Sequence, residues 1–294
     1  MTAVLQIDQL DVALTRGGRL LRGVSLAVEE GSVHGLVGES GAGKSMIGKA
    51  VMGLLPPAAR VTGGAIRFRG EHLLTMPARR RRRLLGAEVA IIPQDPLTAL
   101  NPCRRVGGQI TDRLRLILGW PRGRAEARAA TLLEEVAIRD PAAVMRAFPH
   151  EISGGMRQRI LIAAAFASEP RLIIADEPTT ALDVTVQRQI LRLIADMQAR
   201  HGTAILFVTH DMGVVAKLCR DVSVLYKGAV VSHGPAADLF GGAAAHPYAR
   251  ALIAATPRYD RPDAPFHPVP PDVRADLDAQ VAKLDAAAEA PRHG

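Results

Sequence analysis

The stretch Gly38-Glu39-Ser40-Gly41-Ala42-Gly43-Lys44-Ser45 decides the fold class of this 294-residue chain. It matches the pattern G-x-x-x-x-G-K-[ST], in which glycines let the backbone wrap closely around phosphate groups. The apolar run Val33–Val37 precedes the motif, and a helical pattern from Lys44 to about Leu55 follows it. A strand, a glycine-rich turn and a helix in this order are the context that confirms a phosphate-binding loop, or P-loop.

Two side chains of the loop have predicted roles. Lys44 would neutralise the β- and γ-phosphates of a nucleotide, and the hydroxyl of Ser45 would hold Mg²⁺. The N-terminus of the following helix adds a dipole that favours anions. The loop therefore predicts nucleotide binding, which by itself does not imply hydrolysis.

The rest of the chain alternates strand and helix patterns, which indicates an α/β fold with a mostly parallel sheet. Between about residues 97 and 167 there is no strong strand signal, and this stretch is predicted to be a helical insertion. Further strands are predicted over the following apolar runs: Ala65–Phe68, Val89–Ile92, Leu172–Ala175, Ala204–Val208 and Asp221–Tyr226.

An acidic pair at a strand end indicates hydrolysis. The apolar run Leu172–Ala175 leads directly into Asp176 and Glu177. Asp176 is the expected second anchor of Mg²⁺, and Glu177 can polarise the attacking water, because phosphoryl transfer needs chiefly a positioned water and neutralised phosphate charge. The alternative, that Asp176 only caps a helix, fits less well after an apolar strand and a P-loop.

Two further polar residues end apolar runs. His210 closes the run that begins at Ala204, and Gln94 follows Ile91-Ile92-Pro93. The carboxyl ends of parallel strands meet at the edge where ligands bind in such folds, so both are expected near the γ-phosphate. Alone, either residue would be read as structural.

A Ser-Gly-Gly turn opens another apolar helix. Ser153, Gly154 and Gly155 precede Met156 and the basic pair Arg157 and Arg159. From the residues alone, the turn is either a second anion-binding helix N-terminus or an ordinary capped helix start.

Composition limits the other possibilities. The net charge of +8 and the run Arg79–Arg83 would suit nucleic acid. No aromatic residues interleave the run, so a solvated helix face, close to anionic lipid, is favoured. Cys103 and Cys219 are expected to be reduced and structural. No apolar run is long enough to span a membrane and no signal peptide is recognised, so a cytosolic chain that reaches a membrane through other subunits is expected.

Together these motifs resemble the nucleotide-binding subunits of ABC transporters over about residues 4 to 256. The resemblance implies a P-loop NTPase (RecA-like) ABC ATPase core with an antiparallel β subdomain, a helical subdomain and a short C-terminal tail. It implies a nucleotide-binding domain over residues 1–257, with the helical subdomain at about 97–167, and a partly helical tail over 258–294. The residues that carry it are Gly38–Ser45 as Walker A, Gln94 as the Q-loop, Ile152-Ser153-Gly154-Gly155-Met156-Arg157-Gln158-Arg159 as the signature, Leu172–Pro178 as Walker B, Ala181-Leu182-Asp183 as the D-loop and His210 as the switch histidine.

The resemblance also implies a set of site residues for MgATP. The implied catalytic residues are Glu177, His210 and Gln94, and the implied Mg²⁺ ligands are Ser45, Gln94 and Asp176. The implied nucleotide contacts are Gly38, Glu39, Ser40, Gly41, Ala42, Gly43, Lys44, Ser45, Ser153, Gly154, Gly155, Gln158 and Asp183. In this family two ATPase domains sandwich two ATP molecules head to tail, so Ser153, Gly154 and Gly155 would touch the ATP held by a second subunit.

A narrower resemblance is to the peptide and nickel importer branch. It rests on Gln94–Pro102, the signature, and His246–Leu252, which opens with His246-Pro247-Tyr248. The branch implies an ATPase coupled to uptake of peptides or nickel complexes, a second homologous ATPase chain, two membrane permeases and an extracytoplasmic binding protein, with this chain peripheral on the cytoplasmic face of the inner membrane. Many peptide importers carry a cysteine-rich iron–sulfur site in the tail. No cysteine follows Pro268 here, so no cluster is expected and nickel or another cargo gains weight. Leu14 stands where the family places an adenine-stacking aromatic.

Two other functions compete. A non-transport ABC ATPase acting on nucleic acid or the ribosome is suggested by the basic charge, but such proteins carry two cassettes, coiled coils or zinc modules, whereas this chain has one P-loop, one signature and no metal-spacing cysteines. No nucleic-acid partner is therefore expected. A catalytically dead binding module conflicts with the intact Lys44, Asp176, Glu177 and His210.

The tail has its own pattern. Asp272 can cap a helix in which Val273, Leu277, Val281 and Leu284 form one apolar stripe. Such a stripe predicts docking on this domain or on the second ATPase chain; a frayed, solvated terminus is the alternative.

Overall fold

The computed structural model describes residues 2–180, 182–241, 246–255 and 269–289. The chain divides into two compact units. The first contains residues 1–4, 29–32 and 75–207; the second contains residues 5–28, 33–74 and 208–294. Ala181 and the expected domain boundary at residues 257 and 258 lie outside the described residues.

The second unit has a four-stranded sheet of order β2-β1-β4-β5. In β1, Leu5, Ile7, Leu10 and Val12 are buried, and the alternation changes phase at Gln9, where φ is +47° and the pairing with β4 shifts. This bulge keeps apolar side chains on one face. The strands are β1 (Ala3–Leu14), β2 (Arg19–Glu29), β4 (Ala59–Phe68) and β5 (Glu71–His72).

The same unit holds the strand that leads into the P-loop. Every residue of β3 (Val33–Val37) is buried, as expected of a central parallel strand. β3 runs parallel to β9 (Asp221–Tyr226), and β9 runs antiparallel to β10 (Ala229–Pro235). The helices of this unit are α1 (Lys44–Met52), α9 (Met212–Leu218), α10 (Ala236–Phe240), α11 (Pro247–Ala255) and α12 (Pro271–Glu289).

Two titratable groups lie in the core of this unit. The Nε2 atom of His34 lies 3.0 Å from the hydroxyl of Ser223, and burial lowers the pKa of His34 to about 4, so its ring is neutral near pH 7. Burial raises the pKa of the Cys219 thiol to about 12. Both cysteines are free, and the high pKa makes Cys219 an unreactive part of the core.

In the first unit, three strands lie side by side in the order β8-β7-β6. β6 (Val89–Ile92) is parallel to β7 (Leu172–Asp176), and β8 (Ala204–Thr209) is buried throughout. The amphipathic helix α8 (Val184–His201) follows β7 and buries Ile190, Ile194 and Met197. The exposed arginines of the run 79–83 lie on α2 (Ala78–Glu88), consistent with a solvated helix face.

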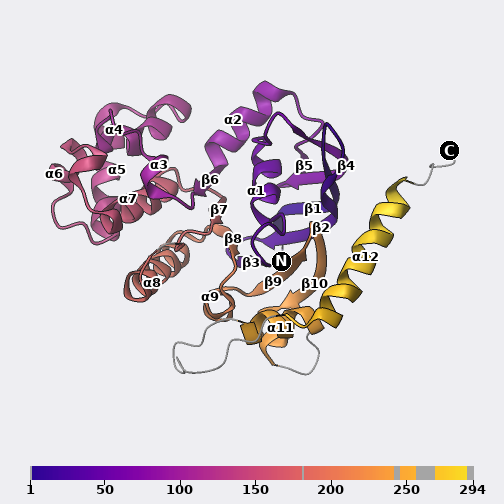
Figure 1. Ribbon diagram of the computed structural model, residues 1–294. Coiled ribbons are helices and arrows are strands. Elements are labelled where there is room, and N and C mark those ends of the chain that lie inside the picture. The colour runs from indigo at the N-terminus through magenta and orange to yellow at the C-terminus, as the bar shows by residue number, and fades with distance from the viewer. Residues whose placement is uncertain (1, 181, 242–245, 256–268, 290–294) are drawn as a thin grey trace. The chain divides into compact units, whose positions relative to one another are not determined.

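The rest of this unit is helical, and its helices gather into one cluster (Figure 1). Asp95 and Asp140 cap helices that start with proline, and α5 packs on α7. The helices are α3 (Pro96–Ala99), α4 (Val106–Asp112), a π-helical turn (Arg113–Ile117), α5 (Arg122–Glu135), α6 (Pro141–Arg146), a 3₁₀ turn (Pro149–Glu151) and α7 (Gly154–Phe166).

Two sequence expectations need correction. The helix after the P-loop ends at Met52 rather than about Leu55, because Gly53 adopts φ +67° and its N–H bonds to the carbonyl of Ala50. The strand expected over Ala65–Phe68 begins at Ala59, since residues 59–61 continue the antiparallel pairing with β1. None of the described helices is long and apolar enough to cross a membrane.

Candidate nucleotide site

The P-loop lies between β3 and α1, as its motif predicts. Gly38 is required by close approach, because an added Cβ would lie 2.3 Å from the carbonyl oxygen of Leu225. α1 begins at Lys44, and its N-cap residue is Gly43, which has no side chain that could cap the first turn. The loop therefore offers a helix N-terminus that suits an anion.

Lys44 places a positive charge inside this loop. The residue is only 4% exposed, and its Nζ donates to the carbonyls of Gly38 (2.8 Å) and Glu39 (3.0 Å). A buried ammonium is costly unless it is paired, and phosphate oxygens are well suited to share it. Charge, glycine geometry and the start of α1 together fit the triphosphate of ATP.

The end of β7 brings Glu177 and Gln94 together. Gln94 Nε2 donates to Glu177 Oε2 over 3.3 Å, and the hydroxyl of Thr180 donates to the same oxygen over 2.9 Å. Glu177 has φ +46°, a left-handed conformation that costs a non-glycine residue about 1–3 kcal/mol. Backbone strain of this kind is often found at functional sites, and here it occurs directly after β7 at a residue whose carboxylate contacts Gln94.

Asp176 precedes Glu177 at the end of β7 and is partly exposed. A carboxylate and an amide oxygen are among the oxygen ligands that Mg²⁺ prefers. Asp176 and Gln94 both belong to the first unit, and Ser45 belongs to the second.

The Ser-Gly-Gly turn is an open helix N-terminus. The Ser153 hydroxyl accepts a hydrogen bond from the N–H of Met156 (3.3 Å) and caps α7. Above Gly154 and Gly155, no described atom lies within 4 Å of an added Cβ. The backbone of the turn is therefore accessible. Capping by Ser153 alone would not require two glycines, so the glycines are better explained by this accessibility.

Gln158 lies in a different environment from the other signature residues. It is 1% exposed, and its Nε2 donates to the carbonyl of Pro178 over 2.7 Å. This contact ties α7 to the segment that follows Glu177. The side chain is placed to position that segment, a role that the sequence motif did not distinguish from direct nucleotide contact.

The remaining predicted residues lie at helix starts and a strand end. Asp183 caps α8 by accepting a hydrogen bond from the N–H of Val186 (2.9 Å), and His210 is exposed directly after β8. Sequence reasoning missed Thr180, which contacts the Glu177 carboxylate. Its spacing of three residues from Glu177, within a turn, was the available signal.

Comparison with known proteins agrees with this geometry. The family model described as "ABC transporter" matches residues 21–180. A model described as "AAA domain, putative AbiEii toxin, Type IV TA system" matches a shorter stretch, residues 145–216. CbiO1 of Clostridium perfringens, part of the ABC transporter complex cbiONQ, superposes with a TM-score of 0.72 at 25% identity, over 82% of this chain and 92% of that one.

The fold and the motifs define a P-loop ATPase, and the chain belongs to the ABC transporter family. Within the family it is an ATP-binding subunit that hydrolyses ATP. The dipeptide transport ATP-binding protein DppD of Escherichia coli is 44% identical over 260 residues, 87% of this chain and 79% of that protein. The probable peptide ABC transporter ATP-binding protein y4tR of Sinorhizobium fredii is 47% identical over 240 residues, 81% of this chain and 71% of that protein.

Proposed function

We propose that this chain is the ATP-hydrolysing motor of a peptide importer, with the P-loop as its phosphate site and Glu177 as its catalytic carboxylate. Lys44 holds the β- and γ-phosphates, and Glu177 positions the attacking water. The observation that supports hydrolysis best is Glu177, which has a left-handed backbone conformation and a carboxylate that accepts hydrogen bonds from Gln94 and Thr180. His210 contacts the γ-phosphate in this proposal.

The proposal assigns Mg²⁺ to Ser45, Asp176 and Gln94. Their hydroxyl, carboxylate and amide oxygens match the ion's preference for oxygen ligands. When bound, Mg²⁺ neutralises charge that develops on the phosphate oxygens. Lys44 supplies the matching positive charge from the protein.

We propose that a second, homologous ATPase subunit completes each site. The accessible backbone at Ser153, Gly154 and Gly155 supports this proposal, because an open helix N-terminus can receive the γ-phosphate of ATP bound to the other subunit. Asp183 lies at the start of α8, where it would face the same interface. Two different chains, rather than two copies of this one, form the proposed pair.

The proposed cargo is a short peptide. Relatives at 44–47% identity over most of this chain are named for dipeptide or peptide transport. The motor would attach to two permeases on the cytoplasmic face of the inner membrane and receive cargo through an extracytoplasmic binding protein. Nickel complexes, the other cargo of the importer branch that the motifs resemble, are the second candidate.

Uptake by cells that lack the native chain tests the cargo. With the full chain restored, we expect uptake of a radiolabelled dipeptide to recover, while ⁶³Ni²⁺ uptake stays at the level of the deletion strain. Cells given the exposed-site variant Lys49→Ala should match wild type. Recovery of nickel uptake without recovery of dipeptide uptake would contradict the peptide assignment.

A further inference from the structure

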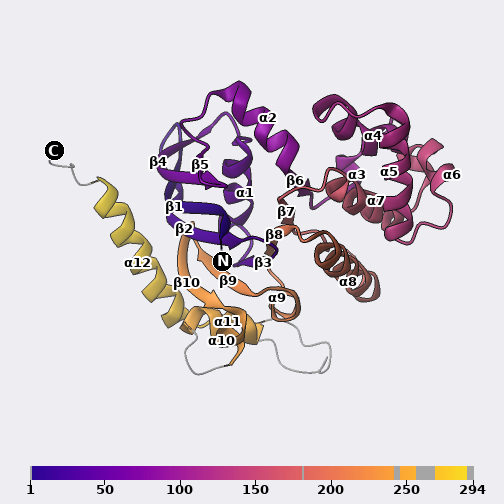
Figure 2. The same ribbon diagram turned by 180° about the vertical axis from the view of Figure 1, so that it is seen from behind.

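The tail helix α12 belongs to the second unit, which also contains the P-loop, and packs against the rest of that unit. Figures 1 and 2 show it running beside the strands of that unit. Leu277 and Val281 are buried, at 1% and 7% exposure, but Leu284 is 43% exposed. The predicted apolar stripe is therefore correct at its centre and wrong at Leu284, because the adjacent Asp285 makes the contact in that turn.

One contact joins α12 directly to the P-loop. Arg274 Nη2 donates to the Glu39 carboxylate over 2.7 Å. Glu39 is the second residue of the loop, and its carbonyl accepts hydrogen bonds from Lys44 Nζ and from the N–H of Ala42. Arg274 therefore contacts a residue, Glu39, whose carbonyl accepts two of the hydrogen bonds within the P-loop.

A second contact reaches the P-loop through the turn between β9 and β10. Asp278 accepts hydrogen bonds from the hydroxyl of Tyr226 (2.8 Å) and from Lys227 Nζ (2.6 Å). The next residue, Gly228, donates its N–H to the carbonyl of Ala42 in the P-loop over 2.8 Å. This turn therefore lies between α12 and the loop and touches both.

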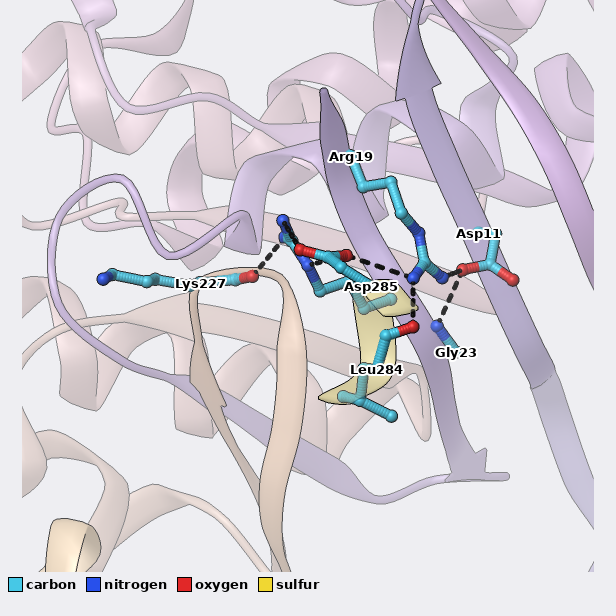
Figure 3. A network of polar contacts seen from close by, with 7 residues as sticks. Asp11, Arg19, Gly23, Lys227, Leu284 and Asp285 are labelled. Carbon is cyan, nitrogen blue, oxygen red and sulfur yellow. Dashed lines mark hydrogen bonds and ion pairs between the residues drawn. The ribbon is translucent and has the colours of Figure 1, made fainter. Parts of the chain in front are cut away.

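A third contact anchors the far end of α12, as Figure 3 shows. Asp285 binds Arg22 through both carboxylate oxygens (2.8 and 3.0 Å), and Arg19 donates to the Leu284 carbonyl (2.8 Å). The N–H of Arg22 bonds to the carbonyl of Gly228, and its guanidinium to the carbonyl of Lys227. Arg22, held by this bidentate ion pair, thus also contacts the β9–β10 turn.

Tyr248 of the His-Pro-Tyr element packs against Tyr226, one of the residues that α12 contacts. Tyr248 is fully buried, and its ring lies edge-on to Tyr226 with centroids 5.1 Å apart. Burial raises the pKa of Tyr248, and the charge of the Glu39 carboxylate adds to the shift, consistent with a position close to the loop. Tyr248 therefore supports the residues that α12 holds.

We propose that α12 is a strap that positions the P-loop, with Arg274, Asp278 and Asp285 as its positioning residues. The strap holds Glu39 directly and Ala42 through the β9–β10 turn, and so keeps the phosphate loop in its binding conformation before nucleotide arrives. A preorganised loop binds with less loss of conformational entropy, so the strap raises affinity for MgATP. The inference rests on the proposed nucleotide site at the P-loop.

The strap can be broken by small changes at its partly exposed contacts. In the purified full-length chain, Arg274→Ala and Asp285→Asn should each raise the Kd for MgATP about twofold to fivefold, the range expected for partly exposed ion pairs. Arg274→Lys should recover part of the affinity. Asp276→Asn makes the same chemical change as Asp285→Asn at an exposed position of the same helix and should bind like wild type.

Amide exchange and steady-state kinetics separate positioning from general destabilisation. Without nucleotide, the strap variants should exchange amides of residues 38–45 faster than wild type and Asp276→Asn. In the assembled transporter their KM should rise while kcat stays within about twofold, because no strap residue reaches the reacting atoms.

The strap proposal would be overturned if Arg274→Ala and Asp285→Asn both bound MgATP with wild-type affinity. It would also be overturned if the amide exchange rates of residues 38–45 were the same as in wild type. The variant Lys44→Ala tests the proposed nucleotide site separately from the strap. If Lys44→Ala loses MgATP binding while the strap variants keep it, the strap alone is wrong. If Lys44→Ala binds like wild type, the proposed nucleotide site itself is wrong.

Discussion

Replacing Glu177 with glutamine is expected to lower ATP hydrolysis by about 10²–10⁴-fold, the usual contribution of a positioned base. The amide has nearly the same size, and its oxygen can still accept the hydrogen bonds that Gln94 and Thr180 donate to the carboxylate. Only the charge and basicity that orient water are removed. MgATP binding should stay within a few-fold of wild type, because the P-loop holds the phosphates.

The measurement is phosphate release by the assembled transporter, with Kd for MgATP determined on the same preparation. Glu134→Gln, an exposed position on α5, is the matched control and should hydrolyse ATP like wild type. If the Glu177→Gln transporter hydrolyses ATP within a few-fold of the wild-type rate, another residue positions the water.

Replacing Lys44 with alanine should weaken MgATP binding by about 100-fold or more. Each charged hydrogen bond to phosphate contributes about 1.5–3 kcal/mol, and Lys44 is expected to make two. The change also removes the donor to the carbonyls of Gly38 and Glu39, so the empty loop loses internal bonds. Turnover at moderate ATP concentration should fall in parallel.

Lys49→Ala is the control for this change. Lys49 lies on the same helix, one turn further on, with its side chain exposed. The Lys49→Ala substitution removes the same charge from α1 without changing the P-loop, so the affinity for MgATP should stay at the wild-type value. Equal affinity losses in the two variants would show that net charge, rather than the buried position of Lys44, attracts the nucleotide.

The local structure around the P-loop was predictable because its motif is local. A P-loop needs glycines, a lysine and a hydroxyl within eight residues, and the neighbouring strand and helix have clear patterns. The contact between Gln94 and Glu177 was not predictable at atomic detail, since it joins residues 83 positions apart in the chain. Thr180 was missed because its role depends on the turn geometry after Glu177.

The N-terminal sheet shows another limit. β1 alternates buried and exposed residues, but the phase changes at the bulge around Gln9, which breaks the period-two pattern. The charged residues of α12 show a third limit of prediction from the sequence. A helix with one apolar stripe was expected, yet Arg274, Asp278 and Asp285 find partners distant in sequence, in the P-loop, at the β9–β10 turn and in strand β2 respectively.

The most direct test of the account is phosphate release from MgATP by the purified chain, measured alone and after assembly with the second ATPase subunit and both permeases. Because the signature turn of the second subunit is proposed to complete each site, the account predicts slow hydrolysis by the chain alone and a strong increase on assembly. The increase should disappear when both ATPase subunits lack the signature serine, Ser153 in this chain. A chain that hydrolyses ATP alone at the full rate, independent of its concentration, would contradict the account.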